Sequence, residues 1–315
     1  MSVIPRIPPV DVAEFGPAFS SIATRKPGTF CDTAEVQDII GRGRRCLDAG
    51  VAVHLSGPAG IGKTALAIRM AAEIGRPMAL LTGHEGLSSK DFVGQEIGHS
   101  ESVVVDKYIQ SVRRKQTQRR VDWRDAMLAE AMREGHTLIY DEFTRASPQA
   151  NVVLLSVLEE GLLVSGGGQS GHSYVRAHPD FRIILTSNPS DYVAVNAAPD
   201  ALLDRMVTFR LDGYSPETEA EILRATTGID AKLARRIVAI VRHIRAEHDE
   251  ALLPSMRTSI LIGRIIAHAA LTDTLDEERF RVVVSDVIRG RAPDIAPDTV
   301  VRAVAQSTVP QPKDA

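Results

Sequence analysis

The chain contains the stretch Gly57-Pro58-Ala59-Gly60-Ile61-Gly62-Lys63-Thr64, which matches the pattern G-x-x-x-x-G-K-[S/T]. It follows an apolar run at 51–55 and opens a helical pattern at 63–74, which is the strand–loop–helix context that this pattern requires. Glycines let successive backbone N–H groups turn toward phosphate oxygens, and the helix N-terminus adds a favourable potential for an anion. Lys63 supplies a charge to the β- and γ-phosphates, and the Thr64 hydroxyl supplies a ligand for Mg²⁺. The stretch therefore predicts a site for a nucleoside triphosphate with its magnesium ion.

Two carboxylates end another apolar run, at 137–140. Unpaired carboxylates beside a core cost free energy, and a magnesium ion gives a reason for them. We expect Asp141 to hold the metal through water, and Glu142 to orient and polarise the water that attacks the γ-phosphorus. Taken alone, the two acids would simply begin a solvated loop, but the phosphate loop upstream favours the catalytic interpretation.

Two further polar residues follow the acidic pair along the chain. Asn188 comes after the apolar run at 182–186, where its amide would contact the γ-phosphate and the attacking water. Arg205 closes a short helical pattern before the run at 206–211. It either complements the helix dipole or acts as an arginine finger toward the nucleotide of a neighbouring subunit, and we favour the finger.

Short apolar runs alternate with helical patterns along much of this 315-residue chain, and this alternation predicts an α/β fold with a parallel sheet covered by helices. Beyond about residue 215 only helical periodicity remains. The expected strands lie at 51–55, 77–81, 136–140, 182–186 and 206–211, and the expected helices at 63–74, 122–133, 148–159, 200–205, 216–226, 231–247, 257–271 and 278–289. We expect a proline-rich, poorly ordered segment at 1–28, an α/β core at 29–214, an all-helical lid at 215–305 and a disordered tail at 306–315.

The composition excludes several classes of protein. Hydrophobic residues make up 44% and charged residues 24% of the chain, which is ordinary for a globular protein. The net charge of −3 and the aromatic content of 4% argue against a nucleic-acid binder. The cysteines, Cys31 and Cys46, match neither a disulfide framework nor a zinc pattern, and indicate a reducing compartment. No apolar run approaches the roughly 18 residues of a membrane span. We expect a cytoplasmic protein that binds neither nucleic acid nor membrane.

Taken in this order, these pieces resemble an AAA+ ATPase over roughly residues 30 to 270. The stretches at 141–146 and 158–161 resemble the MoxR branch of that class, and so does 88–94, where that branch begins an insert in its second helix. A narrower resemblance is to the gas vesicle members of the branch. It is carried by the stretches at 53–60, 140–143, 153–160, 178–182 and 201–205.

The resemblance implies a mostly parallel five-stranded sheet in which the second and fourth strands flank the acidic one. It implies a homo-oligomeric ring of six subunits, with ATP and Mg²⁺ held between neighbours. Within one chain, the implied catalytic residues are Lys63, Glu142 and Asn188, and the implied metal ligands are Thr64 and Asp141. A further catalytic residue, Arg205, is supplied by the next chain. The implied nucleotide contacts are Gly57, Pro58, Ala59, Gly60, Ile61, Gly62, Lys63, Thr64, Ala65, Asp141 and the lid sensor Arg257.

Three features leave alternatives open. Relatives more often carry Asn where this chain has Thr144, which puts in doubt a water-positioning role for that side chain but not the role of Glu142. Arg145 or Arg182 could replace Arg205 as the trans-acting group. A basic run at 113–124 is either a solvated face of the insert or a docking surface for an acidic partner.

The leading hypothesis for function is Mg²⁺-dependent ATP hydrolysis that drives protein remodelling in gas vesicle assembly. The implied partners are vesicle shell or accessory proteins, and the protein would be cytoplasmic and associated with the vesicle. One alternative is a MoxR-type activator of another enzyme, such as a carboxylase or a metal-dependent reductase. Another is a structural component that binds nucleotide with little turnover, against which the intact Glu142 argues. A DNA-remodelling motor is disfavoured by the charge and the aromatic content.

Overall fold

A computed structural model describes residues 31–105, 115–165, 173–188, 200–247, 254–272 and 276–307. The chain divides into two compact units, one formed by 42–56 and 64–210, the other by 1–41, 57–63 and 211–315. The segment 1–28 and nearly all of 306–315, for which we predicted poor order, lie outside the described residues. The predicted boundary at 214–215 stays a prediction.

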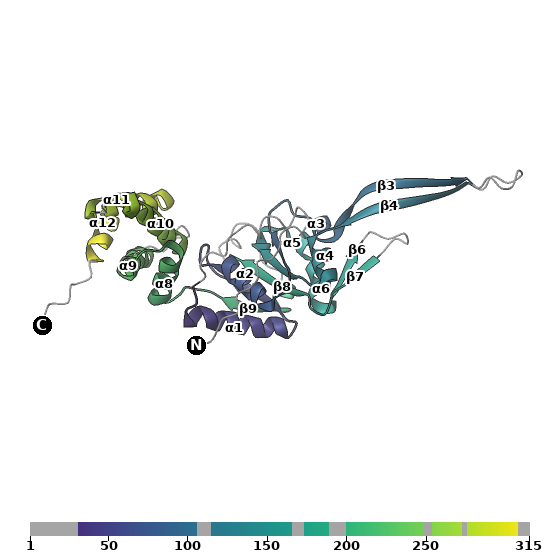
Figure 1. Ribbon diagram of the computed structural model, residues 1–315, viewed down its shortest axis with the longest axis horizontal. Helices are drawn as coiled ribbons and strands as arrows, with labels where there is room; N and C mark the ends of the chain where they lie inside the picture. The colour runs from purple at the N-terminus through teal and green to yellow at the C-terminus, as the bar shows by residue number, and fades with distance from the viewer. Residues whose placement is uncertain are drawn as a thin grey trace, which may run out of the picture. The chain divides into compact units, whose positions relative to one another are not determined.

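The unit that contains residues 64–210 is built on a five-stranded sheet in which every neighbouring pair is parallel (Figure 1). The strand order is β2-β5-β8-β1-β9, so β2 and β8 flank β5, which carries the acidic pair, as the sequence resemblance implied. The strands are β1 (Ala52–Ser56), β2 (Met78–Thr82), β5 (Thr137–Asp141), β8 (Arg182–Ser187) and β9 (Met206–Arg210). The α/β fold class is therefore confirmed.

The helices of this part follow local sequence signals. α2 (Lys63–Ile74) has the predicted bounds. α5 (Pro148–Asn151) begins with Pro148 in its first turn, and the Ala150 N–H donates to the Ser147 hydroxyl at 3.2 Å, so Ser147 is the expected N-cap. The remaining helices are α1 (Ala34–Asp48), α3 (Ser89–Val93), α4 (Met127–Glu134), the 3₁₀ turn η2 (Phe143–Arg145), α6 (Val153–Glu160) and α7 (Asp200–Leu203).

The predicted helix at 122–133 is wrong over its first turn. Residues 122–125 belong to β4 (Lys115–Asp125), which pairs antiparallel with β3 (Gly94–Val105), and α4 begins only at Met127. Hydrogen bonds to a partner strand overrode the local helical pattern, and one sequence does not reveal that partner. Figure 1 shows β3 and β4 as a two-stranded ribbon separate from the central sheet. A shorter antiparallel pair is formed by β6 (Leu162–Ser165) and β7 (Ser173–Arg176).

After residue 215, every secondary-structure element of the described ranges is a helix, as predicted. The helices are α8 (Pro216–Thr227), α9 (Ala231–Glu247), α10 (Met256–Thr272), α11 (Glu277–Arg291) and α12 (Pro297–Gln306). They enclose a core of aliphatic side chains with Phe280, and Leu223, Val241, Ile262 and Val284 are fully buried in it. In the described part of the chain, no helix has the length and apolar character that a membrane span needs.

Candidate nucleotide site

The backbone of the phosphate loop depends on its glycines. Gly60 has φ +84° and Gly62 has φ +99°, in the left-handed region that favours glycine. A Cβ added at Gly57 would lie 2.4 Å from the Leu211 carbonyl oxygen. A side chain would therefore clash at Gly57 and would strain the backbone at Gly60 and Gly62, which explains the glycines of the motif.

The Lys63 side chain lies along the loop that precedes it. Its ammonium group donates to the carbonyl oxygens of Gly57 at 2.7 Å and Pro58 at 2.9 Å, and the residue is only 8% exposed. The positive charge is thus held against the loop whose amides are expected to bind phosphate.

Thr64, the next residue, contacts the acidic end of β5. Its hydroxyl is 2.9 Å from both carboxylate oxygens of Asp141. The Thr186 hydroxyl, at the end of β8, donates to Asp141 Oδ1 at 2.5 Å. A carboxylate and a hydroxyl within hydrogen-bonding distance are the kind of oxygen donors that Mg²⁺ prefers, so these residues fit the expected ion.

Glu142 has an unusual backbone. With φ +54°, it is the one non-glycine residue at positive φ among those that the structure describes. Its N–H donates to the Thr186 hydroxyl at 2.9 Å, and its carboxylate Oε2 lies 3.0 Å from Arg145 Nε. The Gly83 backbone passes so close that an added Cβ would lie 2.2 Å from the Glu142 carbonyl oxygen. Such strain persists only where the surroundings over-determine the conformation, and it is frequent at functional sites.

The predicted sensor Asn188 directly follows β8 and is buried. β5 and β8 are neighbours that pair Tyr140 with Leu185, so their carboxyl ends meet at the same edge of the sheet. Asn188 and Asp141 therefore share this edge.

Arg205 lies at the opposite edge, directly before β9, whose first residue pairs with the first residue of β1. Arg182 opens β8 and lies at the same amino edge. Both arginines line a cavity of about 170 Å³. Its other lining residues are Gly50, Val51, Ala52, Val157, Leu158, Phe181 and Ile183. Arg145, in contrast, is next to Glu142. The structure thus brings Thr64, Asp141, Glu142 and Arg145 together and leaves Arg182 and Arg205 apart from them.

The backbone of the predicted lid sensor, Arg257, lies beside the phosphate loop. A Cβ added at Gly60 would meet Ser255 Oγ at 2.6 Å and Arg257 Cβ at 3.3 Å. Arg257 is the second residue of α10, so the start of this helix lies against the loop. Arg257 is the lid residue predicted to contact nucleotide, whereas Ser255 was not among the predicted contacts.

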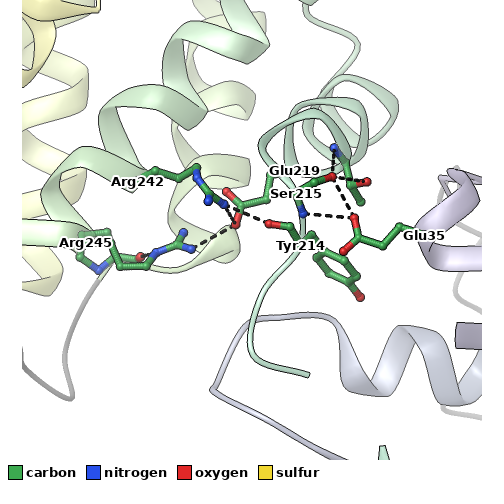
Figure 2. Close-up of polar contacts among 8 residues, drawn as sticks. Glu35, Tyr214, Ser215, Glu219, Arg242 and Arg245 are labelled. Carbon is green, nitrogen blue, oxygen red and sulfur yellow. Dashed lines mark hydrogen bonds and ion pairs between the residues drawn. The ribbon is translucent and has the colours of Figure 1, made fainter. Parts of the chain in front are cut away.

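A buried carboxylate on α8 was missed from the sequence. Glu219 is 2% exposed, and its Oε1 lies 3.1 Å from Arg245 Nη1 and 3.3 Å from Arg242 Nη1 (Figure 2). Arg242 Nη1 also donates to the Tyr214 carbonyl oxygen at 3.0 Å. The only signal in the sequence is a glutamate on the apolar face of an amphipathic helix. This cluster ties α8 and α9 to the segment before α8.

The same segment is tied to α1 through Glu35. The Ser215 N–H and hydroxyl both donate to Glu35 Oε2, at 3.1 Å and 2.9 Å (Figure 2). Burial alone would raise the pKa of Glu35, but hydrogen bonds from Thr218 and Ser215 outweigh burial and lower it. Burial and the nearby Glu35 charge raise the pKa of Tyr214 to about 12, so its phenol is neutral at physiological pH.

Three features together define an AAA+ ATPase. They are a phosphate loop between β1 and α2, an acidic pair at the end of β5, and the strand order β2-β5-β8-β1-β9. Residues 52–206 match the family model of the AAA domain (dynein-related subfamily). This protein is accordingly a nucleotide-binding ATPase.

Comparison with known proteins narrows the class. The chain is 39% identical over 272 residues to the gas vesicle ATPase GvpN of Ancylobacter aquaticus, a match that covers 86% of this chain and 76% of the relative. It is 37% identical over 264 residues to the gas vesicle ATPase GvpN1 of Halobacterium salinarum, covering 84% and 75%. Protein CbbQ of Hydrogenophilus thermoluteolus is 26% identical over 220 residues, covering 69% and 74%. The chain belongs to the gas vesicle ATPase GvpN family.

Proposed function

We propose that this protein hydrolyses ATP with Mg²⁺ and uses the energy to remodel partner proteins during gas vesicle assembly. The observation that carries the chemical part is the contact of Thr64 with Asp141, because it joins the residue after the phosphate-loop lysine to the end of the acidic strand. The vesicle context is supported by the names of the GvpN relatives.

Each site residue has a distinct task in this proposal. The loop 57–62, whose residues other than Pro58 offer backbone N–H groups, binds the phosphates together with the Lys63 ammonium and Ala65, while Thr64 and Asp141 would hold the metal. Magnesium, when bound, neutralises charge on the β- and γ-phosphate oxygens. Glu142 orients and polarises the attacking water, Asn188 contacts the γ-phosphate, and Arg257 reads the nucleotide from the lid.

Arg205 acts on the nucleotide of a neighbouring subunit. Its place at the amino edge of the sheet, with Asp141 and Asn188 at the carboxyl edge, supports a role outside its own site. An arginine finger of this kind contributes roughly 10³–10⁵-fold to turnover. The proposal therefore includes a homo-oligomeric ring of six subunits, in which each site is complete only with its neighbour.

The proposed partners are gas vesicle shell or accessory proteins, and the proposed location is the cytoplasm, at the growing vesicle. A second candidate is activation of another enzyme, which the resemblance to the MoxR branch implies. The 26% identity to protein CbbQ over 69% of this chain shows that similarity extends beyond the gas vesicle relatives. The two candidates differ in the protein that the ring captures.

The test combines an ATPase assay on the purified protein with complementation of a vesicle-forming host that lacks the gene. Purified protein should release phosphate from ATP only with Mg²⁺, and Lys63→Ala and Glu142→Gln should reduce release to background. Lys232→Ala and Glu130→Gln are matched exchanges at exposed positions and should keep the parental rate. In a vesicle-forming host without the gene, the parent but not Glu142→Gln should restore vesicles. Full vesicle formation with Glu142→Gln would refute the proposed role of hydrolysis, and capture of an unrelated enzyme would favour the second candidate.

A further inference from the structure

Thr186 has no role in the proposal above, yet its hydroxyl contacts both acidic residues. It lies on β8, is fully buried, and directly follows Leu185, which pairs with Tyr140 of β5. The hydroxyl accepts the Glu142 N–H at 2.9 Å and donates to Asp141 Oδ1 at 2.5 Å. One side chain thus connects the expected metal ligand with the backbone of the expected catalytic base.

The direction of these bonds follows from the chemistry of the groups. A backbone N–H can only donate, and an ionised carboxylate can only accept, so the single hydroxyl proton of Thr186 goes to Asp141. Thr64 donates to the same carboxylate from the start of α2. A continuous chain of hydrogen bonds therefore runs from Thr64 through Asp141 and Thr186 to the Glu142 backbone.

The conformation of Glu142 explains why such a contact is needed. Its φ of +54° is unfavourable for a residue with a side chain, so neighbouring groups must hold it. Gly83 packs against its carbonyl group, and the Gly83 N–H donates to the Asp141 carbonyl oxygen at 2.7 Å. Thr186 holds the other side of the same peptide through the N–H.

We propose that Thr186 is a positioning residue that fixes the direction of the Glu142 carboxylate and orients Asp141 for the metal. This inference rests on the proposed roles of Glu142 and Asp141. Without the hydroxyl, the Glu142 N–H loses its partner, Asp141 Oδ1 loses one of its two hydroxyl contacts, and the left-handed turn loses one of the hydrogen bonds that hold it. A displacement of about 1 Å at a catalytic group can lower turnover by about 10²-fold.

The deciding variant is Thr186→Val, which keeps the shape of the side chain and removes the hydroxyl. We expect kcat for ATP hydrolysis to fall about 10- to 100-fold while KM for ATP changes less than about threefold. Thr186→Ser keeps the hydroxyl and should restore kcat to within about threefold of the parent.

Thr137→Val is the matched control. Thr137 lies on the adjacent strand β5, is equally buried, and its hydroxyl has no hydrogen-bond partner among the residues that the structure describes. The same exchange at the same depth of the same sheet should therefore leave kcat unchanged. A parental kcat in Thr186→Val would overturn the inference. So would a Thr186→Ser variant as slow as Thr186→Val, because packing of the methyl group would then be responsible.

A second measurement does not depend on turnover. Binding of a fluorescent ATP analogue is measured at increasing Mg²⁺ concentration. Thr186→Val should need about tenfold more Mg²⁺ than the parent for half-maximal binding. Thr186→Ser and Thr137→Val should need the same concentration as the parent. An unchanged requirement in Thr186→Val would contradict the orientation of Asp141 by Thr186. A parent that binds ATP without hydrolysing it would refute the proposed function, and the titration would still decide the role of Thr186.

Discussion

The Glu159 carboxylate at the end of α6 holds the guanidinium group of Arg205 through a single oxygen, with Oε2 3.0 Å from Nε and 2.6 Å from Nη2. The third nitrogen, Nη1, donates to the Ala201 carbonyl oxygen at 2.6 Å. The side chains are 30% and 57% exposed for Arg205 and Glu159. An ion pair this exposed contributes little to stability, so its main effect is to fix the direction of the guanidinium group.

We therefore expect Glu159→Ala to lower kcat by about 3- to 10-fold, because Arg205 loses a preorganising contact. The melting temperature should stay close to that of the parent. Glu160→Ala, an exchange at the next exposed residue, is the control and should behave as the parent. Steady-state phosphate release and thermal unfolding measure both effects. An unchanged kcat in Glu159→Ala would show that Arg205 does not depend on Glu159.

Subunit mixing tests the trans action of Arg205. Lys63→Ala and Arg205→Ala should each be inactive alone, but roughly a quarter of the interfaces in an equal mixture pair an intact loop with an intact arginine. Phosphate release should therefore return on mixing. When Arg145→Ala replaces Arg205→Ala, release should not rise above the average of the two variants measured separately, because Arg145 contacts Glu142 of its own chain. If mixing with Arg145→Ala rescues Lys63→Ala and mixing with Arg205→Ala does not, the arginine finger is Arg145.

Glu219 is expected to stabilise the helices after residue 215. Glu219→Ala removes the shared carboxylate of Arg242 and Arg245 and leaves two positive charges together. The cost should be about 2–3 kcal/mol, below that of a fully buried pair because the arginines are about a third exposed. Chemical denaturation followed by circular dichroism measures it. Glu221→Ala, which breaks an exposed pair with Arg224 on the same helix, should leave the unfolding midpoint unchanged.

The stability contributed by Glu35 should depend on pH. Its folded-state pKa is lowered from the ordinary value of 4.5, so its contribution is present above pH 4.5 and is lost as the pH falls through the folded pKa. The melting temperature of Glu35→Gln should thus lie below that of the parent at neutral pH, and the difference should shrink in acid. A difference that stays constant down to pH 3 would show that the hydrogen bonds to Ser215 do not require the charge.

Much of the fold was predictable because it depends on local periodicity. The five parallel strands and α2, α8 and α9 follow apolar runs and amphipathic spacing, and the start of α5 follows its capping residue Ser147. The β3–β4 ribbon was not predictable in this way, because its strands are stabilised by each other. Helical spacing at 122–125 therefore predicted the wrong element.

For the candidate site, the sequence by itself determined which chemical groups are present: the loop with Lys63 and Thr64, and the acids that end β5. These follow from residue types at fixed spacing along the chain. Only the tertiary structure decided that the Thr186 hydroxyl joins Asp141 to Glu142, and that Arg205 lies at the other edge of the sheet from Asp141. The physical reason is that these relations depend on which strands are neighbours and on hydrogen bonds between residues distant in the chain.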